Sequence, residues 1–439
     1  VYFAVVLTDP STPDPDPDPD NLWGRFYSTD VDFGDESILE IETIDIADPS
    51  VSKSQKIFET IAKVSQGILS IGDPVRSDYY GRIGATPYSS DENGCGSYSA
   101  ITSGYMIRQY PTFGDNKRGI DLSFTELFDS LNSIDDIGVG FEKWVDSYKL
   151  RWERKNFFYQ DSEIIHLQHV PKIKRSVAQE YAYNDILIGF EKWKINDLNG
   201  LDEYCAQSQY TNGLKSVSQT LEKLSPIIAS PYILETIRRM KYSQTATTDT
   251  DFDSDNFIVA LNREQEYGGE PTNLETAEKD ENFSLIANVL SPETSYNLRF
   301  TTSKNLLRNV PSISPIITNY EGRSIKFTSG EGNISIVTKD TVDCPSYYNN
   351  QSLEGNQDII WDESGEMPLF VAEYLEFQYP ITREQYLLIK DAHENPDSEV
   401  HNGYITISNE KETFKGFLIY LKYKQKTGLS TFKLIRKYD

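Results

Sequence analysis

His166 and His169 are the two residues whose type and spacing come closest to a metal site. Histidines three positions apart face one ion only on a helix, where residues i and i+3 share a face. The surrounding residues predict strand and loop instead, and no cysteine or acidic cluster stands at a zinc-ligand spacing nearby. His393 and His401 flank a polar loop, where exposure to solvent is the favoured interpretation. The histidines therefore predict no metal site.

The run from Asp249 to Asp255 begins like a calcium loop, with an aspartate at every second position. An EF-hand needs glycine at its sixth position and glutamate at its twelfth. Ser254 and Ala260 occupy those positions, so the EF-hand interpretation fails. A solvated loop is favoured over a looser calcium site.

Cys95 lies between two glycines, a setting that suggests an exposed nucleophile. Its neighbours in sequence are acidic or neutral, and such neighbours do not lower the pKa of a thiol. No Gly-x-Ser-x-Gly elbow and no phosphate-binding glycine loop occur. Carboxylate pairs are so abundant that a glycosidase pair is neither located nor excluded. We therefore predict no catalytic residue, no metal, no cofactor and no enzymatic activity.

The cysteine content favours a reduced compartment or indifference to redox state. The chain has three cysteines, Cys95, Cys205 and Cys344, which cannot all pair with one another. No Cys-x-x-Cys motif occurs among them.

Composition sets the class of molecule. At 439 residues the chain is long enough for about three domains. Its 42 Lys and Arg against 68 Asp and Glu give a net charge of −26. A surface this acidic repels phosphate, which argues against nucleic acid and anionic membrane as main partners. No apolar run approaches the ~18 residues that cross a bilayer, so we expect no membrane-spanning segment.

Helices and strands are predicted from caps and periodicity. Ser123 and Glu126 form a capping box, and an apolar stripe with helical spacing follows it. The period then changes to two from Ile137 onward, which predicts a β-hairpin after the helix. Another helix is predicted over 51–66, ending at Gly67.

One pentapeptide occurs twice: Gly140-Phe-Glu-Lys-Trp144 returns as Gly189-Phe-Glu-Lys-Trp193. Duplication of a sub-domain and coincidence both explain it.

Later segments predict more strand than helix. The patterns predict strands over 257–261 and 296–301, a short helix over 303–309, and a hairpin from strands 324–328 and 333–338. The last seventy residues predict a β-α-β-β-β unit, whose helix starts at a Thr382/Gln385 capping box.

That unit has no net charge, so the rest of the chain carries the whole −26. This uneven distribution of charge has two explanations. The C-terminal unit docks on an acidic neighbour, which includes another copy of the chain, or the difference is ordinary surface variation.

The predicted fold class is α+β, predominantly β, in several domains. Residues 1–21 form an acidic Pro/Asp spacer, 22–120 a loop-rich N-terminal domain with one helix, 121–345 a β-rich central part, and 346–439 the C-terminal unit. Tyrosines gather in the N-terminal domain, where a subunit interface is favoured over a sugar-binding platform. They are Tyr79, Tyr80, Tyr88, Tyr98, Tyr105 and Tyr110.

The order of motifs resembles large structural tail proteins of tailed bacteriophages that infect Bacteroidetes-type bacteria. The resemblance covers most of residues 120–439 and resides in SFTELFDSLN, IGVGFE, LRWER, FFYQD, NDILIGFEKW, NFIVALNRE, YNLRFTTSKNLLRN, IKFTSGEG, LEFQYPITREQYLLIKD and GFLIYLKYKQKTGLSTFKLI. These proteins are tail hub or baseplate components, and nothing in the resemblance transfers an active site.

The resemblance implies a homotrimer in the virion tail, assembled in the host cytoplasm. Its subunits contribute similar β-barrel domains over 121–345, join the tail tube to the distal tip and let viral DNA pass only in transit during ejection. Phe141, Trp144, Phe190 and Trp193 are then expected as packing or interface anchors of two barrel-like units. A receptor- or carbohydrate-binding tail protein, and the hub of a contractile injection system, are the alternatives.

Overall fold

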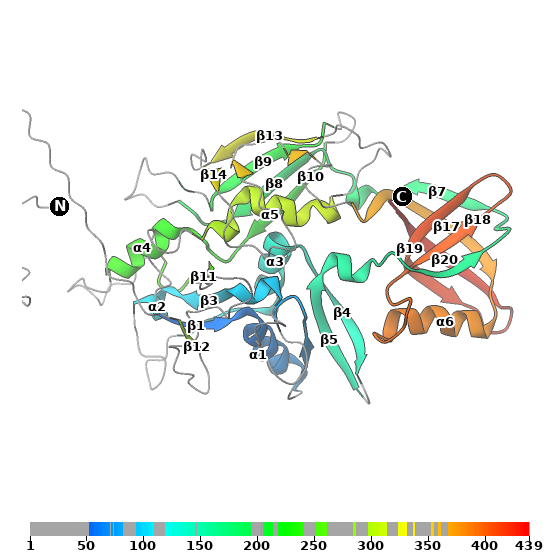
Figure 1. Cartoon of the computed structure of the whole chain (residues 1–439), viewed down its shortest axis with the longest axis horizontal. Coiled ribbons are helices and arrows are strands. Elements are labelled where there is room, and N and C mark those ends of the chain that lie inside the picture. Colours follow the sequence, from blue (N-terminus) through cyan, green and yellow to red (C-terminus); the bar gives the residue numbers. More distant parts are fainter. Residues whose placement is uncertain are drawn as a thin grey trace, which may run out of the picture. The chain divides into compact units, whose positions relative to one another are not determined.

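The protein has a mixed α+β fold in which strand exceeds helix, as the sequence predicts (Figure 1). Among the described residues strand accounts for 41% and helix for 29%. The computed structural model describes residues 52–70, 72, 74–81, 94–108, 119–144, 147–194, 203, 205–213, 218–240, 252–260, 284–286, 297–313, 324–331, 337–338, 353–354, 359–360 and 368–438. The predicted spacer 1–21 and the residues Cys344, Tyr88, Tyr110, Asp249 and Asp251 lie outside these ranges.

The first sheet has four strands in the order β11-β3-β1-β12. Its strand β3 lies between β1 and β11 and is buried at every position, because both of its faces are covered: Ile101 packs in the cluster that contains α1, and Ala100 in the cluster that contains α4. Helix α1 follows β1 directly and packs its apolar face on this sheet. The elements of this part are β1 (Ser52–Lys56), α1 (Ile57–Leu69), η1 (Cys95–Tyr98), β3 (Ser99–Ser103), α2 (Gly104–Ile107), α4 (Pro231–Met240), β11 (Asn256–Ala260) and β12 (Ser284–Ile286).

The second sheet has five strands in the order β10-β8-β9-β13-β16. Strand β10 runs parallel to β8, whereas β9 and β13 continue the sheet in antiparallel pairs. Helices α3 and α5 pack beside this sheet and against each other. The elements are α3 (Phe124–Asp135), β8 (Asp185–Phe190), β9 (Gln207–Thr211), β10 (Thr220–Ser225), η6 (Leu298–Phe300), α5 (Thr302–Asn309), η7 (Val310–Ser312), β13 (Ser324–Glu331) and β16 (Ile359–Ile360), with a separate pair β14 (Val337–Thr338) and β15 (Leu353–Glu354).

A β-hairpin follows α3, as the change of period predicts. Strand β4 (Ile137–Trp144) pairs antiparallel with β5 (Ser147–Arg154), and β2 (Val75–Arg76) adds to β5 in parallel. The outer part of this hairpin projects away from the two larger sheets (Figure 1).

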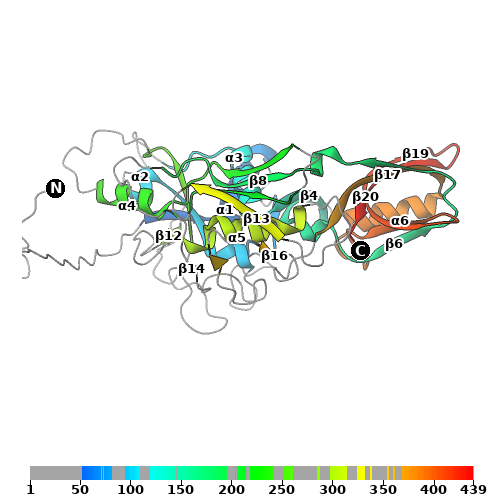
Figure 2. The same cartoon turned by 90° about the horizontal axis from the view of Figure 1, so that it is seen from above.

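The C-terminal sheet combines strands from two distant stretches of sequence (Figure 1, Figure 2). Its order is β6-β18-β19-β20-β17-β7, so the two edge strands β6 and β7 come from the central part of the chain. The predicted β-α-β-β-β order appears as β17, α6, β18, β19 and β20. The bounds are β6 (Glu163–Leu167), β7 (Ile173–Val177), β17 (Phe370–Pro380), α6 (Arg383–Glu394), β18 (Tyr404–Ser408), β19 (Thr413–Tyr423) and β20 (Leu429–Lys437), with η2 (Lys155–Phe158) and η3 (Gln179–Tyr181) beside them.

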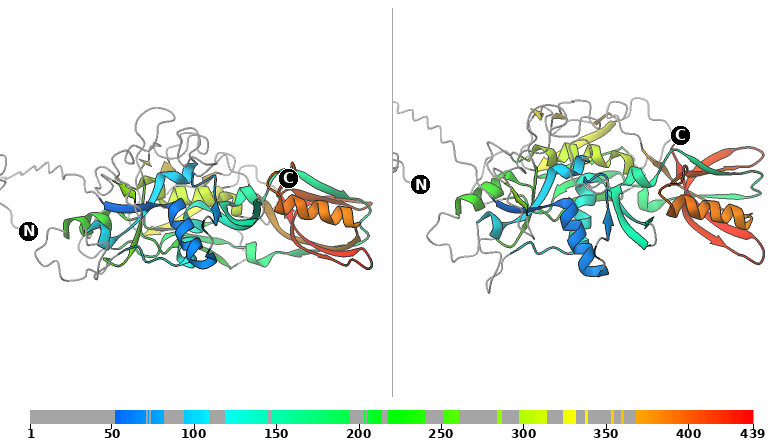
Figure 3. Two further views of the ribbon diagram at one scale, coloured as in Figure 1. Left: turned by 90° about the horizontal axis from the view of Figure 1, so that it is seen from below. Right: turned by 60° about the horizontal axis from the view of Figure 1, so that its bottom comes forward.

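This sheet is curled around one core. Ile164 of edge strand β6 shares a hydrophobic cluster with Leu375 of β17, and Ile173 of edge strand β7 packs against the same cluster. The two edge strands are joined by residues 168–172 alone, so the two edges of the sheet must curve toward each other. Ile389 and Ala392 of α6 complete the core, and Figure 3 shows the helix lying along the sheet. The sheet nevertheless stays open, and no sheet of the described residues closes into the expected barrel.

A buried ionic cluster surrounds the end of α3. The carboxylate of Asp135 is fully buried and accepts hydrogen bonds from the hydroxyls of Tyr79 at 2.9 Å and Tyr80 at 3.2 Å. Arg308 and Arg299 lie 3.3 Å and 3.6 Å from the same carboxylate. Tyr79 and Tyr80 therefore belong to the core and not to a sugar-binding surface.

Three predicted elements differ in the structure. The segment 296–301 is not a strand: η6 lies there, starting after Asn297 in the left-handed region. The hairpin predicted over 324–338 does not form, because β13 continues to Glu331 and pairs with β9. Helix α1 starts after a strand and continues through Gly67 to Leu69, where Ser70 adopts the left-handed conformation.

Candidate functional site

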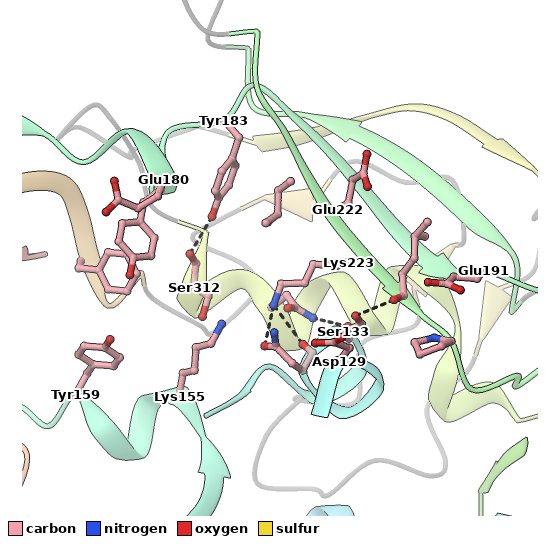
Figure 4. A pocket seen from close by; sticks show the side chains of 17 residues that line it. Asp129, Ser133, Lys155, Tyr159, Glu180, Tyr183, Glu191, Glu222, Lys223 and Ser312 are labelled. Atoms are coloured by element: carbon pink, nitrogen blue, oxygen red, sulfur yellow. Dashed lines mark hydrogen bonds between the residues drawn. The ribbon is translucent and has the colours of Figure 1, made fainter. Parts of the chain in front are cut away.

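A cavity of about 540 Å³ lies where α3, β10, η2, η3 and the start of β17 meet. Helix α3 contributes Asp129 and Ser133, and strand β10 contributes Glu222 and Lys223. Figure 4 shows these side chains with Lys155, Tyr159, Glu180 and Tyr183 around the same space.

The floor of the cavity is a buried Lys–Asp–Lys cluster. Asp136 follows the last residue of α3 and is fully buried. Its carboxylate lies 2.7 Å from the Lys155 ammonium and 3.6 Å from the Lys223 ammonium, and it accepts a hydrogen bond from Ser312. Figure 4 shows the two lysines reaching toward each other from η2 and β10. One carboxylate thus holds two cations.

Burial dominates the electrostatics of this cluster. It lowers the pKa of Lys223 to about 7, and the nearby Lys155 ammonium acts in the same direction. Burial alone raises the pKa of Asp136, but Lys155, Lys223 and the hydrogen bonds outweigh it and hold that pKa below its ordinary value. Asp136 therefore stays ionised.

The Lys223 amino group lies among acceptors from the end of α3. Its ammonium donates to Asn132 Oδ1 at 2.9 Å and to the Asn132 carbonyl at 3.3 Å, in addition to the ion pair with Asp136. An ammonium has three N–H groups, and three acceptors surround it here.

The rim of the cavity is acidic and aromatic. Four carboxylates line it and are exposed to solvent: Asp129, Glu180, Glu191 and Glu222. A hydrogen bond from the Tyr374 hydroxyl holds the pKa of Glu180 below its ordinary value. Burial, followed by the neighbouring Tyr181, raises the pKa of Tyr159 to about 12, so this phenol is neutral.

One buried acceptor at the cavity lacks a donor. Asn309 is 1% exposed, and its side-chain amide donates to the carbonyls of Ser133 and Asn305 at 2.9 Å each. Its Oδ1 accepts no hydrogen bond. A buried polar atom of this kind costs about 1–3 kcal/mol until a donor reaches it.

The predicted anchor residues have different settings. Phe190 is fully buried in the main core, as expected of an anchor. Phe141 is 70% exposed, so within this chain it anchors no core, because it lies on the projecting part of the hairpin. Trp193 is half-buried beneath the Lys194 ammonium, and the side chain of Trp144 lies outside the described part.

The repeated pentapeptide occupies two different structural settings. Its first copy lies on β4, which pairs only with β5 in its sheet. The second begins on β8, between β9 and β10, where β8 ends at Phe190. The described strands therefore give the repeat no structural equivalence.

The four predicted histidines differ in their exposure to solvent. His166 is exposed on β6 and His169 follows it in the left-handed region, so the strand-and-loop setting is as predicted. His393 and His401 are half-buried, not exposed, and burial lowers the pKa of both. No three His, Cys, Asp or Glu side chains of the described ranges are grouped to hold a metal ion.

The other candidates of the sequence are engaged elsewhere. Cys95 is buried and disulfide-bonded, which corrects both the exposed-nucleophile and the reduced-cysteine expectation. Cys205 is a free thiol, and burial raises its pKa. Asp253 pairs with Arg108 and Asp255 with Lys192, so these two aspartates are held by cations.

The sequence contains one signal for the cavity floor. Asp135 and Asp136 close α3, where the helix dipole disfavours negative charge. Two carboxylates at that end indicate that cations lie close to them. Lys155, Lys223 and Asn309 carry no such signal, because they reach the site only through tertiary packing.

Comparison with models of protein families, with curated proteins and with solved structures found no match for the chain. Of the helices in the described ranges, none combines the length and the apolar character that crossing a bilayer requires.

Proposed function

We propose that this chain is a structural virion protein, a tail hub or baseplate component that joins a tail tube to the distal tip and surrounds a channel. The observation that carries the proposal is the β4–β5 hairpin, which presents large apolar side chains on a fixed element. Phe141 is 70% exposed and Tyr148 is 51% exposed. Exposed apolar side chains that lie together on an ordered element are typical of contacts with other proteins.

The base of this hairpin is held firmly on one face. Trp152 is fully buried between the rings of Phe124 and Phe128, with centroids 5.1 Å and 6.0 Å away. Val139 lies opposite Trp152 and Phe141 lies opposite Leu150, so all four share this face of the hairpin.

The opposite face of the hairpin is clamped by charge. Glu142 is buried and lies 3.3 Å from Arg76 and 3.4 Å from Arg151. One face is therefore fixed near the base and the other beside Phe141, so Phe141 and Tyr148 are held in place for a partner.

The cavity supports a role in assembly over one in catalysis. Its two lysines are paired with a buried carboxylate, and its phenol Tyr159 stays neutral. None of these groups is arranged as a nucleophile with an adjacent base.

The acidic surface fits a channel that DNA crosses. A net charge of −26 repels phosphate and reduces adhesion of a passing genome. The described sheets are open, so the proposal rests on the hairpin and the charge and not on barrel-like hub domains over 121–345.

Mass photometry of the purified chain tests the proposal. We expect a homotrimer, and we expect Phe141→Ser with Tyr148→Ser to weaken assembly while the melting temperature stays within about 2 °C, since both side chains are exposed. Leu387→Ser with Leu388→Ser, on the exposed side of α6, is the matched control. A monomer that binds specific sugars on a glycan array favours the receptor- or carbohydrate-binding alternative. A micrograph of a contractile sheath around the protein favours the injection-system hub.

A further inference from the structure

The turn between β19 and β20 is a basic surface on a strongly acidic chain. Lys422, Lys424 and Lys426, which we call the basic turn, are all exposed, and none forms an ion pair with a described residue. Tyr420 and Leu429 beside them are 50% and 36% exposed. Three free ammonium groups with an apolar flank fit an acidic pocket of another protein.

The cavity described above has the complementary chemistry. Of its rim carboxylates, Asp129, Glu191 and Glu222 form no ion pair with a residue of the described ranges. The half-buried rings of Tyr159 and Tyr181 line the same space, and aromatic faces attract ammonium groups.

The floor of the cavity also admits a cationic ligand. The two lysines of the floor do not reverse this preference, because Asp136 pairs with both of them. The rim and floor together carry more carboxylates than ammonium groups.

The basic turn cannot reach the cavity of its own chain. Phe370 at the start of β17 lines the cavity, whereas Pro380 at its end lies opposite Leu429, next to the turn. Strand β17 therefore separates them by ten residue steps, roughly 33 Å in an extended strand. Only another molecule can bring the two surfaces together.

We propose that the basic turn of one copy docks into the acidic cavity of a second copy and places a lysine ammonium against its rim. Each molecule has one basic turn and one cavity, so the contact is head-to-tail and it closes only as a ring. The inference rests on the proposed function, because it names the contact by which the hub assembles.

Two charge-reversal variants test the contact. The turn variant carries Lys422→Glu, Lys424→Glu and Lys426→Glu, and the cavity variant carries Glu191→Lys and Glu222→Lys. All five side chains are exposed, so we expect both variants to fold with an unchanged circular-dichroism spectrum. Each variant alone should run as a 50.1 kDa monomer in mass photometry. Reversal of three other exposed lysines, Lys172, Lys390 and Lys411, is the control and should leave assembly unchanged.

Mixing the two variants gives the decisive measurement. The turn variant retains an intact cavity and the cavity variant retains an intact basic turn, so the native turn of one variant meets the native cavity of the other. The reversed turn and the reversed cavity also have opposite charges, so we expect the mixture to assemble into particles that contain both variants. Carbodiimide should cross-link lysines of the basic turn to rim carboxylates between wild-type copies only.

The outcomes separate this inference from the proposed function. A wild-type trimer together with a turn variant that still forms trimers overturns the docking contact and leaves the hub proposal intact. A mixture that stays monomeric also overturns the contact. A wild-type chain that stays monomeric at micromolar concentration counts against both.

Discussion

Asp135 shows how much of this fold depends on single buried charges. Two tyrosine hydroxyls and two arginines converge on its carboxylate, which has no access to solvent. Burial and the Asp135 carboxylate raise the pKa of both Tyr79 and Tyr80 far above the ordinary value, so the phenols stay protonated donors. A carboxylate in this position is stable only while every partner is present.

Replacing Asp135 by asparagine should destabilise the protein by about 3–5 kcal/mol, because the buried Arg299 and Arg308 both lose this anionic partner. Urea unfolding followed by tryptophan fluorescence measures the change. Asp121→Asn, an exposed aspartate before the same helix, should stay within about 0.5 kcal/mol of wild type. Equal losses of stability in Asp135→Asn and Asp121→Asn would contradict the buried network of tyrosines and arginines around Asp135.

Lys223 predicts a dependence of stability on alkaline pH. Its pKa is about 7 in the fold and 10.5 when unperturbed, so between these values the unfolded chain binds more protons than the folded one. The free energy of unfolding therefore rises with pH across this range, by about 1 kcal/mol per pH unit from this group. Lys223→Met removes the titrating group at similar side-chain length. The free energy of unfolding of the wild type minus that of the variant should increase from pH 7 to pH 9.5 in urea titrations. Parallel curves of this free energy against pH would rule the effect out.

At the scale of elements, two glycines have opposite roles. Gly67 lies inside α1, and a Cβ atom there meets nothing within 4 Å. Gly189 on β8 has a φ of +139°, and a Cβ atom there lies 2.0 Å from the Ala206 carbonyl oxygen. Gly67 only weakens its helix, whereas the backbone conformation at position 189 requires glycine.

Gly67→Ala should therefore stabilise the protein by about 0.5–1 kcal/mol. Gly189→Ala should destabilise it by about 3 kcal/mol, because both the backbone conformation and the contact with β9 resist a side chain. Thermal unfolding of the two single variants measures both changes. Changes of the same sign would show that one of the two placements is wrong.

Local chemistry explains which elements the sequence predicts well. Helices α3 and α6 begin where predicted, because each capping box is complete: Ser123 with Glu126 and Thr382 with Gln385. The β4–β5 hairpin and the C-terminal strand order were equally clear, since their pairing is between neighbours in sequence. The cavity could not be predicted, because its floor joins Asp136 to Lys223 from a separate strand.

Elements that depend on distant partners were missed. Strand β13 pairs with β9 rather than turning at its glycines, and no local pattern indicates that partner. The 3-10 turn at 298–300 reads as a strand in sequence, but Asn297 binds the backbone of Ala229, Ile258 and Ala260 and fixes a turn there. Tertiary contacts decided both cases.

At the scale of the whole molecule, the C-terminal sheet is not a self-contained unit. Its edge strands β6 and β7 come from residues 163–177, and Ile164, Leu167 and Val170 contribute to its core. Without them β17 and β18 lose their outer partners and the core loses three buried side chains.

We therefore predict that a fragment of residues 346–439 does not fold cooperatively. A chain that joins 160–180 to 366–439 should fold, since Tyr374 contacts Glu180 and a short linker bridges the ends. Amide dispersion in a ¹⁵N spectrum distinguishes the two, with narrow dispersion expected for the first and wide dispersion for the second. A well-dispersed spectrum from 346–439 alone would show that β6 and β7 are dispensable.

The same two edge strands set the order of events on the ribosome. The Glu163 carboxylate of β6 accepts a hydrogen bond from the hydroxyl of Thr406, which is synthesised 243 residues later. At typical translation rates of 5–20 residues per second, the nascent strand waits roughly 10–50 s before its sheet exists. The sheet that carries the basic turn therefore forms only after β20 has been synthesised, and a chain released before that point lacks a strand of this sheet.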